Sequence, residues 1–465
     1  MSTIENAALF ATLQQSAERD VVTAIEALVR DGDDRALNRI NLCDFAQAHG
    51  FDEDKVIAAF VHAARLGLFE MSWNVLCPSC GGVLDSGVTL KAVNRSEYSC
   101  AFCALGYEPT LDETVEVSFT VSPSVRSIAA HAPDTLPFAE YCRQIFWSTG
   151  VDLPEDFAHA ADEITLDMVE LPPGEKAILS VHLPPQLVII FDPVTHGAQF
   201  VDVKGEPTRE RQSLAMILSK GHAAVGRIAL QPGPLRVSFE NHSGRRALPA
   251  LWIADERMEA MLGRRKPFLT AKRLLTNQTF RDVYRTDTLD VDQRLKITSL
   301  TFLFTDLKGS TELYERVGDL VAYDLVKAHF RILQEIVAAE SGAVVKTIGD
   351  AVMATFPTPS RAVAAALRMR EAIRKLDEGL TLKIGIHVGP CLAVVLNERQ
   401  DYFGQTVNIA SRVQGLAETR SIYATDQVLG HSDTAKVLEA RGITPKPQTH
   451  VLRGIAHEVL VYEIA

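Results

Sequence analysis

The stretch that decides the fold of the C-terminal region is Leu300-Thr301-Phe302-Leu303-Phe304, followed by Thr305-Asp306-Leu307-Lys308-Gly309-Ser310-Thr311. Its first five residues have the aromatic and branched content of a strand that is buried on both faces. Apolar residues at three- and four-residue spacing follow from Tyr314 to Ile332 and predict a helix. A carboxylate at a strand end before Gly-Ser-Thr at a helix start is typical of a phosphate and metal site. Because Asp and Ser also cap ordinary helices, this segment alone does not decide the function.

A second segment predicts a β-hairpin. Apolar runs at residues 342–348 and 351–356 flank Gly349-Asp350, which is a typical turn pair. If this hairpin lies beside the first strand, Asp350 and Asp306 converge, and two adjacent carboxylates repel each other unless a cation lies between them. Such a pair can hold two magnesium ions about 4 Å apart, as in two-metal phosphoryl chemistry. Taken alone, Gly-Asp is also an ordinary surface turn.

The third group of residues follows further along the chain. Residues 382–390 alternate as a strand, in which His387 is expected to be structural. In residues 401–412, Asn408 and Arg412 are four positions apart and therefore share one face of a helix. An amide and a guanidinium that face a cleft suit a polyphosphate substrate.

In this order, the three segments resemble the class III nucleotidyl cyclases, the adenylate and guanylate cyclase superfamily, over residues 297–465. The resemblance implies a ferredoxin-like α/β domain with an antiparallel-rich sheet and a homodimer in which each site combines two subunits. It implies two magnesium or manganese ions per site, held by Asp306, Asp350 and the carbonyl of Leu307. Its other implied site residues are Gly309, Ser310 and Thr311 (phosphates), Lys346 and Asp401 (purine), Asn408 and Arg412 (ribose and transition state), and Arg453 (a late phosphate contact).

The two purine positions favour adenine. Adenine presents an acceptor at N1 and a donor at the 6-amino group, whereas a Lys ammonium only donates and an Asp carboxylate only accepts. Lys346 with Asp401 therefore complements adenine, and guanine would leave mismatched polar groups that cost about 1–3 kcal/mol each. The prediction is an adenylate cyclase, a lyase that converts ATP to 3′,5′-cyclic AMP and pyrophosphate.

Composition limits the class of protein. The chain has 465 residues with 47% hydrophobic and 23% charged residues, which indicates several globular domains. Its formal net charge is −12, so duplex DNA would need a local basic patch. No apolar run reaches the roughly 18 residues of a membrane helix, and the N-terminus lacks the pattern of a secretory signal. We therefore expect a cytoplasmic protein without a membrane partner.

Residues 74–110 contain the clearest metal-binding pattern. Cys77 and Cys80 are separated by 19 residues from a second pair, Cys100 and Cys103. Two such corners bring four thiolates around a tetrahedral ion, and zinc suits sulfur ligands. The pattern predicts a zinc ribbon with one structural zinc ion, because four protein ligands leave no open position. The alternative is a set of redox-active or unliganded thiols.

The remaining N-terminal segments predict regulatory modules. Residues 1–73 resemble a winged helix, but the second helix offers Lys55 and Arg65 beside three acidic residues, so a protein-interaction or structural role is favoured over DNA reading. Residues 111–255 alternate as strands and predict a β-sandwich-like module, and residues 256–296 predict a helical linker that carries a signal. The N-terminal half also resembles an uncharacterised domain found ahead of some bacterial cyclases. The expected fold class is thus multidomain α+β.

Two functions remain open at this point. The first is an adenylate cyclase regulated by its N-terminal modules through an unknown ligand or protein. The second is a DNA-binding or signalling regulator in which the cyclase-like domain only senses nucleotide. A guanylate cyclase is disfavoured by the Lys346/Asp401 pair, and a diguanylate cyclase is disfavoured because no Gly-Gly-Asp/Glu-Glu-Phe signature appears.

Overall fold

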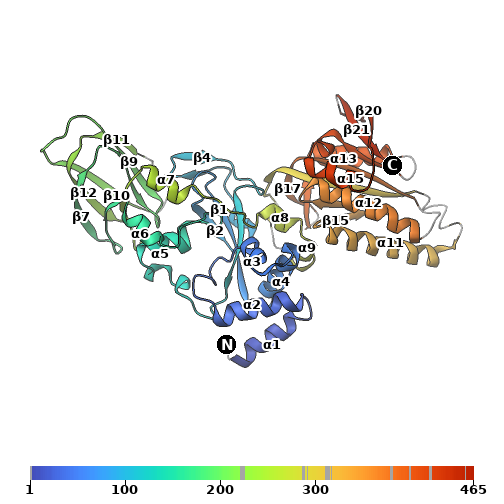
Figure 1. Cartoon of the computed structure of the whole chain (residues 1–465), viewed down its shortest axis with the longest axis horizontal. Coiled ribbons are helices and arrows are strands. Elements are labelled where there is room, and N and C mark those ends of the chain that lie inside the picture. Colours follow the sequence, from blue (N-terminus) through green and yellow to red (C-terminus); the bar gives the residue numbers. More distant parts are fainter. Residues whose placement is uncertain are drawn as a thin grey trace. The chain divides into compact units, whose positions relative to one another are not determined.

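The computed structural model describes residues 3–219, 226–284, 289–290, 292–308, 315, 317–376, 381–396, 399–417, 421–455 and 457–465. The chain forms two compact units, which we call the N-terminal unit (residues 1–109 and 113–269) and the C-terminal unit (residues 110–112 and 270–465). In Figure 1 the first runs from blue to green and the second from yellow-green to red. The boundary between them falls inside the segment predicted as a linker.

The N-terminal unit begins with four helices. They are α1 (Thr3–Leu13), α2 (Arg19–Asp31), α3 (Leu42–His49) and α4 (Glu53–Arg65). The Asn41 side chain caps α3 by accepting from the N–H groups of Cys43 and Asp44, and Gly50 ends this helix in the left-handed conformation with φ 67°. Local sequence therefore fixes both ends of α3.

A small sheet packs against these helices. Its order is β2 (Val83–Gly87), β1 (Phe69–Leu76) and β5 (Val115–Val121), all antiparallel, and Ile40 adds a single bridge to Phe119. Rings of Phe60 on α4, Phe69 on β1 and Phe119 on β5 form the contact, with centroids 5.1 and 5.5 Å from Phe60. The cysteine-rich segment lies between β1 and β5 in sequence. Cys77 and Cys80 lie between β1 and β2, and the second pair lies at the short hairpin of β3 (Tyr98–Cys100) and β4 (Leu105–Tyr107).

Two further sheets follow in the N-terminal unit. One has the order β10-β12-β7 and the other the order β11-β9-β8-β13-β6. Their buried residues form one cluster, in which Val237 and Phe239 of β12 pack with Val188 and Ile190 of β8. The bounds are β6 (Thr165–Met168), β7 (Lys176–Leu183), β8 (Leu187–Asp192), β9 (Gly197–Val203), β10 (Gln212–Leu218), β11 (Gly226–Leu230), β12 (Gly233–Asn241) and β13 (Ala250–Ile253).

Short helical segments border these sheets. They are α5 (Phe138–Tyr141), a π-helical turn (Cys142–Phe146), α6 (Phe157–Asp162) and α7 (Glu256–Leu262). Phe102 packs edge-on against both Trp147 and Trp252, at ring centroid distances of 5.6 and 5.8 Å. The cysteine-rich segment therefore shares the core of this unit, and both tryptophans are buried there.

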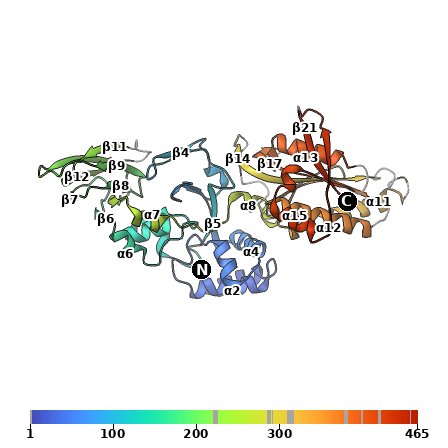
Figure 2. The same cartoon turned by 45° about the horizontal axis from the view of Figure 1, so that its top comes forward.

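The C-terminal unit is built on one mixed sheet. Its order is β15-β16-β14-β17-β19-β21-β20, and β18 pairs with β17 off this path. The central strand β14 (Leu295–Lys308) pairs antiparallel with β16 (Ala351–Phe356) and with β17 (Thr381–Leu396), which lies beside it in Figure 2. β14 is longer than the five-residue strand predicted from Leu300–Phe304. The others are β15 (Ala343–Ile348), β18 (Arg399–Phe403), β19 (Ile422–Thr425), β20 (Lys446–Val451) and β21 (Glu458–Ile464).

Helices cover both faces of this sheet. α11 (Asp319–Ala339) and α12 (Pro359–Leu376) share one cluster with Ile422 and Ala424 of β19, whereas α13 (Gln405–Gly415) shares another with Tyr423. Alternate residues of a strand point to opposite faces, so α13 lies across the sheet from α11 and α12. The remaining helices are α8 (Ala271–Leu275), α9 (Gln278–Val283), α14 (Asp426–Leu429) and α15 (Ser432–Glu439). The mixed α/β architecture predicted for this region is confirmed.

Candidate active site

The strand that carries Asp306, β14, is a neighbour of β16, which directly follows Asp350. β16 pairs with β14 through Phe304 opposite Met353 and Thr305 opposite Val352, and Val352 N donates to Thr305 Oγ1 at 3.1 Å. If the same register continues for one more residue, Asp306 lies opposite the residue that directly follows Asp350. The hairpin of β15 and β16 therefore lies beside the first strand, as predicted. Both carboxylate residues are half-buried.

A buried histidine that the sequence analysis did not single out faces Asp350. His329 on α11 is 0% exposed, and burial lowers its pKa to about 4, with Asp350 opposing that shift. The polar neighbour of its ring is the backbone of Asp350. His329 lies four residues from Leu325 and from Leu333, so its place on the apolar face of α11 was visible in the helical spacing. Its contact with Asp350 could not be read from the helical spacing.

The two predicted purine-selecting residues are in contact. Lys346 on β15 places its Nζ 2.5 Å from Asp401 Oδ2 on β18. The other oxygen, Asp401 Oδ1, accepts from the N–H of Tyr402 at 2.8 Å. The Asp401 side chain is 8% exposed and that of Lys346 is 42% exposed, so the acceptor is fixed and the donor lies nearer to solvent.

The predicted helix that carries Asn408 and Arg412 is α13, and both residues lie on it. The helix approaches the sheet closely because a Cβ at Gly385 on β17 would lie only 2.1 Å from Gln414 N. Asn408 is exposed and Arg412 is half-buried. A Cβ at Gly454 would lie 3.4 Å from Arg412 Nη1, so the Arg412 guanidinium rests beside this glycine.

The structure also describes two further predicted site residues, Leu307 and Arg453. Leu307 is buried and lies opposite Leu382 in the ladder between β14 and β17. Arg453 is exposed and precedes Gly454, which brings it near the Arg412 end of α13. Gly309, Ser310 and Thr311 lie outside the described residues. Within the described part of the chain, no hydrogen bond or ion pair joins Asn408 or Arg412 to Asp306 or Asp350.

The four cysteines of the N-terminal unit form a compact cluster. The Sγ atoms of Cys77, Cys80, Cys100 and Cys103 all lie within 4.8 Å of one another, and Cys80 and Cys100 are 3.7 Å apart. A tetrahedral zinc ion with Zn–S bonds of about 2.3 Å requires S–S separations of about 3.8 Å. Gly81, with φ 75°, makes the turn after the first pair, and Gly82 N donates to Cys80 Sγ at 3.4 Å. The cluster therefore fits a tetrahedral metal ion.

The thiols of this cluster affect one another's ionisation. Hydrogen bonds from the other thiols, that of Cys100 foremost, lower the pKa of Cys77. Interaction with the same groups raises the pKa of Cys80 and of Cys100. Four neighbouring thiolates repel each other unless a cation compensates their charge, so this chemistry also fits a metal ion.

Comparison with known families also divides the chain into two parts, but the boundary falls after residue 282, so the first match includes α8 and most of α9 of the C-terminal unit. Residues 293–451 match the adenylate and guanylate cyclase catalytic domain, so the C-terminal unit carries a class III nucleotidyl cyclase domain, as predicted. Residues 2–282 match a family of unknown function, DUF5939. Because this second match covers more than half of the chain, the protein belongs to the DUF5939 family.

Individual relatives each match about a third of the chain. An adenylate cyclase of Streptomyces griseus is 31% identical over 158 residues, which are 34% of this chain and 36% of that protein. An adenylate cyclase of Streptomyces coelicolor is 34% identical over 127 residues, 27% of this chain and 31% of that protein. Guanylate cyclase 32E of Drosophila melanogaster is 29% identical over 165 residues, 31% of this chain and 14% of that protein. This chain therefore covers at most 36% of the length of these curated relatives.

Solved structures resemble a similar share of the chain. The adenylyl cyclase CyaB from P. aeruginosa is 23% identical with a TM-score of 0.33, and the match covers 37% of this chain and 96% of that chain. The guanylate cyclase domain of RhGC from Catenaria anguillulae is 23% identical with a TM-score of 0.32, and the match covers 37% of this chain and 97% of that chain.

Among the described residues, no helix is both long enough and apolar enough to span a membrane.

Proposed function

We propose that this protein is an adenylate cyclase that converts ATP to 3′,5′-cyclic AMP and pyrophosphate. The observation that carries the proposal is the contact between Lys346 and Asp401 in a cyclase domain. Lys346 donates to adenine N1, and Asp401 accepts from the 6-amino group. With guanine, each residue would face a group of its own hydrogen-bonding type, which costs about 1–3 kcal/mol per mismatched group.

The pair must open to admit the base. Asp401 is nearly buried and already accepts from its own backbone neighbour, so it remains in place. Lys346 is more exposed, and its four-carbon side chain can swing while β15 stays fixed. The ion pair therefore keeps the Asp401 carboxylate oriented until adenine takes over the contact.

Asp306, Asp350 and the carbonyl of Leu307 would hold two magnesium or manganese ions. Oxygen ligands from carboxylates and a carbonyl suit these hard cations, and the β14–β16 pairing brings the two acids to one edge of the sheet. When bound, such ions lower the pKa of the ribose 3′-hydroxyl and neutralise charge on the triphosphate.

The reaction exchanges one bond to the α-phosphorus for another. The 3′-oxygen gives its proton to solvent and attacks the α-phosphorus, and the bond from the α-phosphorus to the oxygen that bridges to the β-phosphate breaks to release pyrophosphate. Asn408 orients the ribose, and Arg412 stabilises negative charge on the transferring phosphoryl group. Gly309, Ser310 and Thr311 bind the phosphates, and Arg453 adds a further cationic contact.

A homodimer completes the site. Asn408 and Arg412 lie on α13, across the sheet from α11, and make no described bond to the two acids. A second copy of the chain can supply these side chains to the acids of the first. Closure by a two-fold axis then gives two equal sites.

The N-terminal unit regulates this activity. Its four-cysteine cluster holds one structural zinc ion, which stabilises the segment between β1 and β5. A DNA-binding role is less favoured because Lys55 of α4 is already paired with Glu18 at 2.7 Å. The β-rich region and the zinc segment would instead bind a small ligand or a protein.

Product analysis tests the proposal. The full-length chain is incubated with ATP or GTP and Mg²⁺ or Mn²⁺, and the cyclic product and pyrophosphate are separated by chromatography. We expect cyclic AMP and equimolar pyrophosphate from ATP and little product from GTP. Cyclic GMP as the main product, or neither product with any metal, would refute the proposal.

A further inference from the structure

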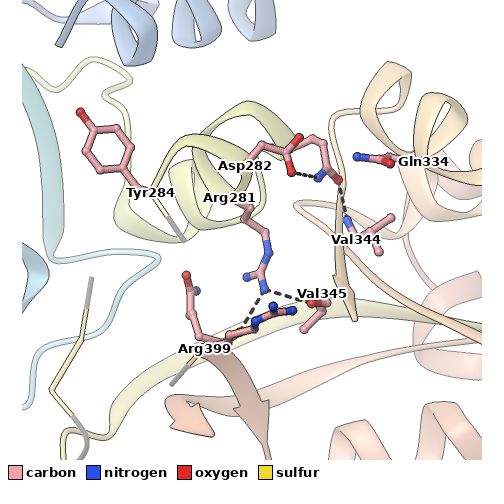
Figure 3. Close-up of a pocket in the computed structure, with 9 residues that line it drawn as sticks. Arg281, Asp282, Tyr284, Gln334, Val344, Val345 and Arg399 are labelled. Carbon is pink, nitrogen blue, oxygen red and sulfur yellow. Dashed lines mark hydrogen bonds between the residues drawn. The ribbon is translucent and has the colours of Figure 1, made fainter. Parts of the chain in front are cut away.

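A helix that precedes the cyclase sheet holds the two purine-selecting strands together. Arg281 on α9 uses its Nη2 to donate to the carbonyl of Gln400 at 3.0 Å and to the carbonyl of Val345 at 3.4 Å (Figure 3). Val345 immediately precedes Lys346, and Gln400 immediately precedes Asp401. One guanidinium therefore bridges the backbone next to both base-reading residues.

The carbonyl of Val345 is available because β15 is irregular at this position. In its ladder with β16, Val344 pairs with Ala354 and Lys346 pairs with Met353, so Val345 is left over as a bulge. A bulged residue loses its regular partners and re-aims its neighbour's side chain. The bulge thus directs Lys346 and gives Arg281 an acceptor.

The two strands are not joined to each other within the sheet. β15 is at one end of the strand order, and β18 pairs with β17 off the main path. Apart from the Lys346–Asp401 ion pair, Arg281 is the described side chain that spans them. Because the ion pair must open when a base enters, Arg281 is the contact that persists.

Other contacts fix α9 in this place. Asn277 caps the helix by accepting from Phe280 N at 3.1 Å, and the Phe280 side chain is fully buried. Gln278 accepts from Val344 N at 2.8 Å, which holds the start of the bulge (Figure 3). The Arg281 guanidinium also lies 6.0 Å from the ring centroid of Tyr402, the residue after Asp401. A cavity of about 250 Å³ lies beside these residues.

We propose that Arg281 is a positioning residue for purine selection, which rests on the proposed cyclase function. It fixes the spacing of the backbones that carry Lys346 and Asp401, so that both reach one adenine edge at once. A planar guanidinium presents several donors in a rigid fork, whereas a Lys ammonium is a compact charge on a flexible stem. Because α9 belongs to the segment that leads into β14, a displacement of α9 would also change this spacing.

Substitution of Arg281 in the full-length chain tests the inference. In Arg281→Ala, we expect the ratio of kcat/KM for ATP to that for GTP to fall about tenfold, mainly through a higher KM for ATP. Arg399→Ala is the matched control, because Arg399 lines the same cavity but makes no described bond to either carbonyl. The ATP-to-GTP ratio of kcat/KM in Arg281→Lys should lie between that of Arg281→Ala and that of the unmodified protein.

A second measurement does not depend on turnover. Without nucleotide, amide hydrogen exchange in residues 343–347 and 399–403 should increase in Arg281→Ala and stay unchanged in Arg399→Ala. If the unmodified chain makes no cyclic nucleotide, the cyclase proposal fails while this result still reports on Arg281. An unchanged selectivity ratio in an active Arg281→Ala, unchanged exchange, or equal effects of Arg399→Ala would overturn the inference. If Arg281→Ala does not fold, the same criteria apply to Arg281→Lys.

Discussion

Lys346 Nζ and Asp401 Oδ2 are 2.5 Å apart, although 55 positions separate the two residues in the chain. One lies on the first strand of the sheet order and the other on a strand outside that order. Their contact forms a donor and an acceptor at one point, which is the arrangement that an adenine edge requires.

Reversing this pair should reverse the base preference. The double variant Lys346→Glu/Asp401→Lys keeps an ion pair but presents an acceptor to guanine N1–H and a donor to guanine O6. We expect kcat/KM for ATP to fall at least tenfold and the ATP-to-GTP ratio to shift toward GTP, as measured by product chromatography. Reversal of the exposed Lys436–Asp433 pair is the control. An unaltered ATP preference in the folded variant would contradict the purine assignment.

The two acidic residues should be required for catalysis and not for folding. In Asp306→Asn or Asp350→Asn, the charge that attracts the divalent ions is lost while the shape is kept, so cyclic AMP formation should fall by at least 100-fold, about 2.7 kcal/mol in activation free energy. The melting temperature and the dimer should be retained. Asp433→Asn, on the exposed face of α15, should keep full activity. Activity near the unmodified level in either acid variant would show that these residues do not hold the ions.

Gly454 should matter through Arg412. Its φ of 73° disfavours any side chain, and a Cβ would lie 3.4 Å from Arg412 Nη1. Gly442 has a similar φ of 65° but nothing within 4 Å of a built Cβ. Both Gly→Ala substitutions should destabilise the protein by about 1 kcal/mol, measured by urea unfolding. Only Gly454→Ala should also lower kcat. If Gly442→Ala lowers kcat equally, the effect of Gly454→Ala does not act through Arg412.

The cysteine cluster should bind one zinc ion per chain. Elemental analysis of the purified full-length protein should find it, and Cys77→Ser or Cys100→Ser should lose it. Chelation should lower the melting temperature of the N-terminal unit, because metal binding contributes to folding free energy. Cys43→Ser, outside the cluster, should keep its zinc. A metal-free protein whose melting is insensitive to chelators would rule out the zinc ribbon.

His387 should make the stability of the protein depend on pH. Burial lowers its pKa to about 4, and its Nδ1 lies 2.8 Å from Thr425 Oγ1. An unfolded histidine titrates near 6.5, so between pH 6.5 and pH 4 the unfolded state binds more protons than the folded state. The unfolding free energy should therefore fall as pH drops through this range, by about 1 kcal/mol from this residue between pH 7.5 and 5.5.

Urea unfolding at the two pH values measures this effect. In His387→Gln, that share of the pH dependence should disappear. His431 is exposed, so His431→Gln should leave the dependence intact. If both variants keep the full dependence, His387 is not its source.

Local sequence determined much of this protein. The apolar runs and the Gly349-Asp350 turn predicted β15 and β16, and the spacing of Asn408 and Arg412 placed them on α13. The two Cys pairs predicted a cluster that the structure forms. These predictions rest on backbone preferences and on short-range spacing, which neighbouring residues alone set.

Only the tertiary structure decided which distant residues meet. Strand order placed β16 beside β14, and a bulge at Val345 freed the carbonyl that Arg281 binds. The contact of His329 with Asp350 and the position of Gly454 beside Arg412 also depend on how separate elements pack. Side-chain periodicity tells which face of an element is buried, but not which partner covers it, because the partner is chosen by the packing of the whole unit.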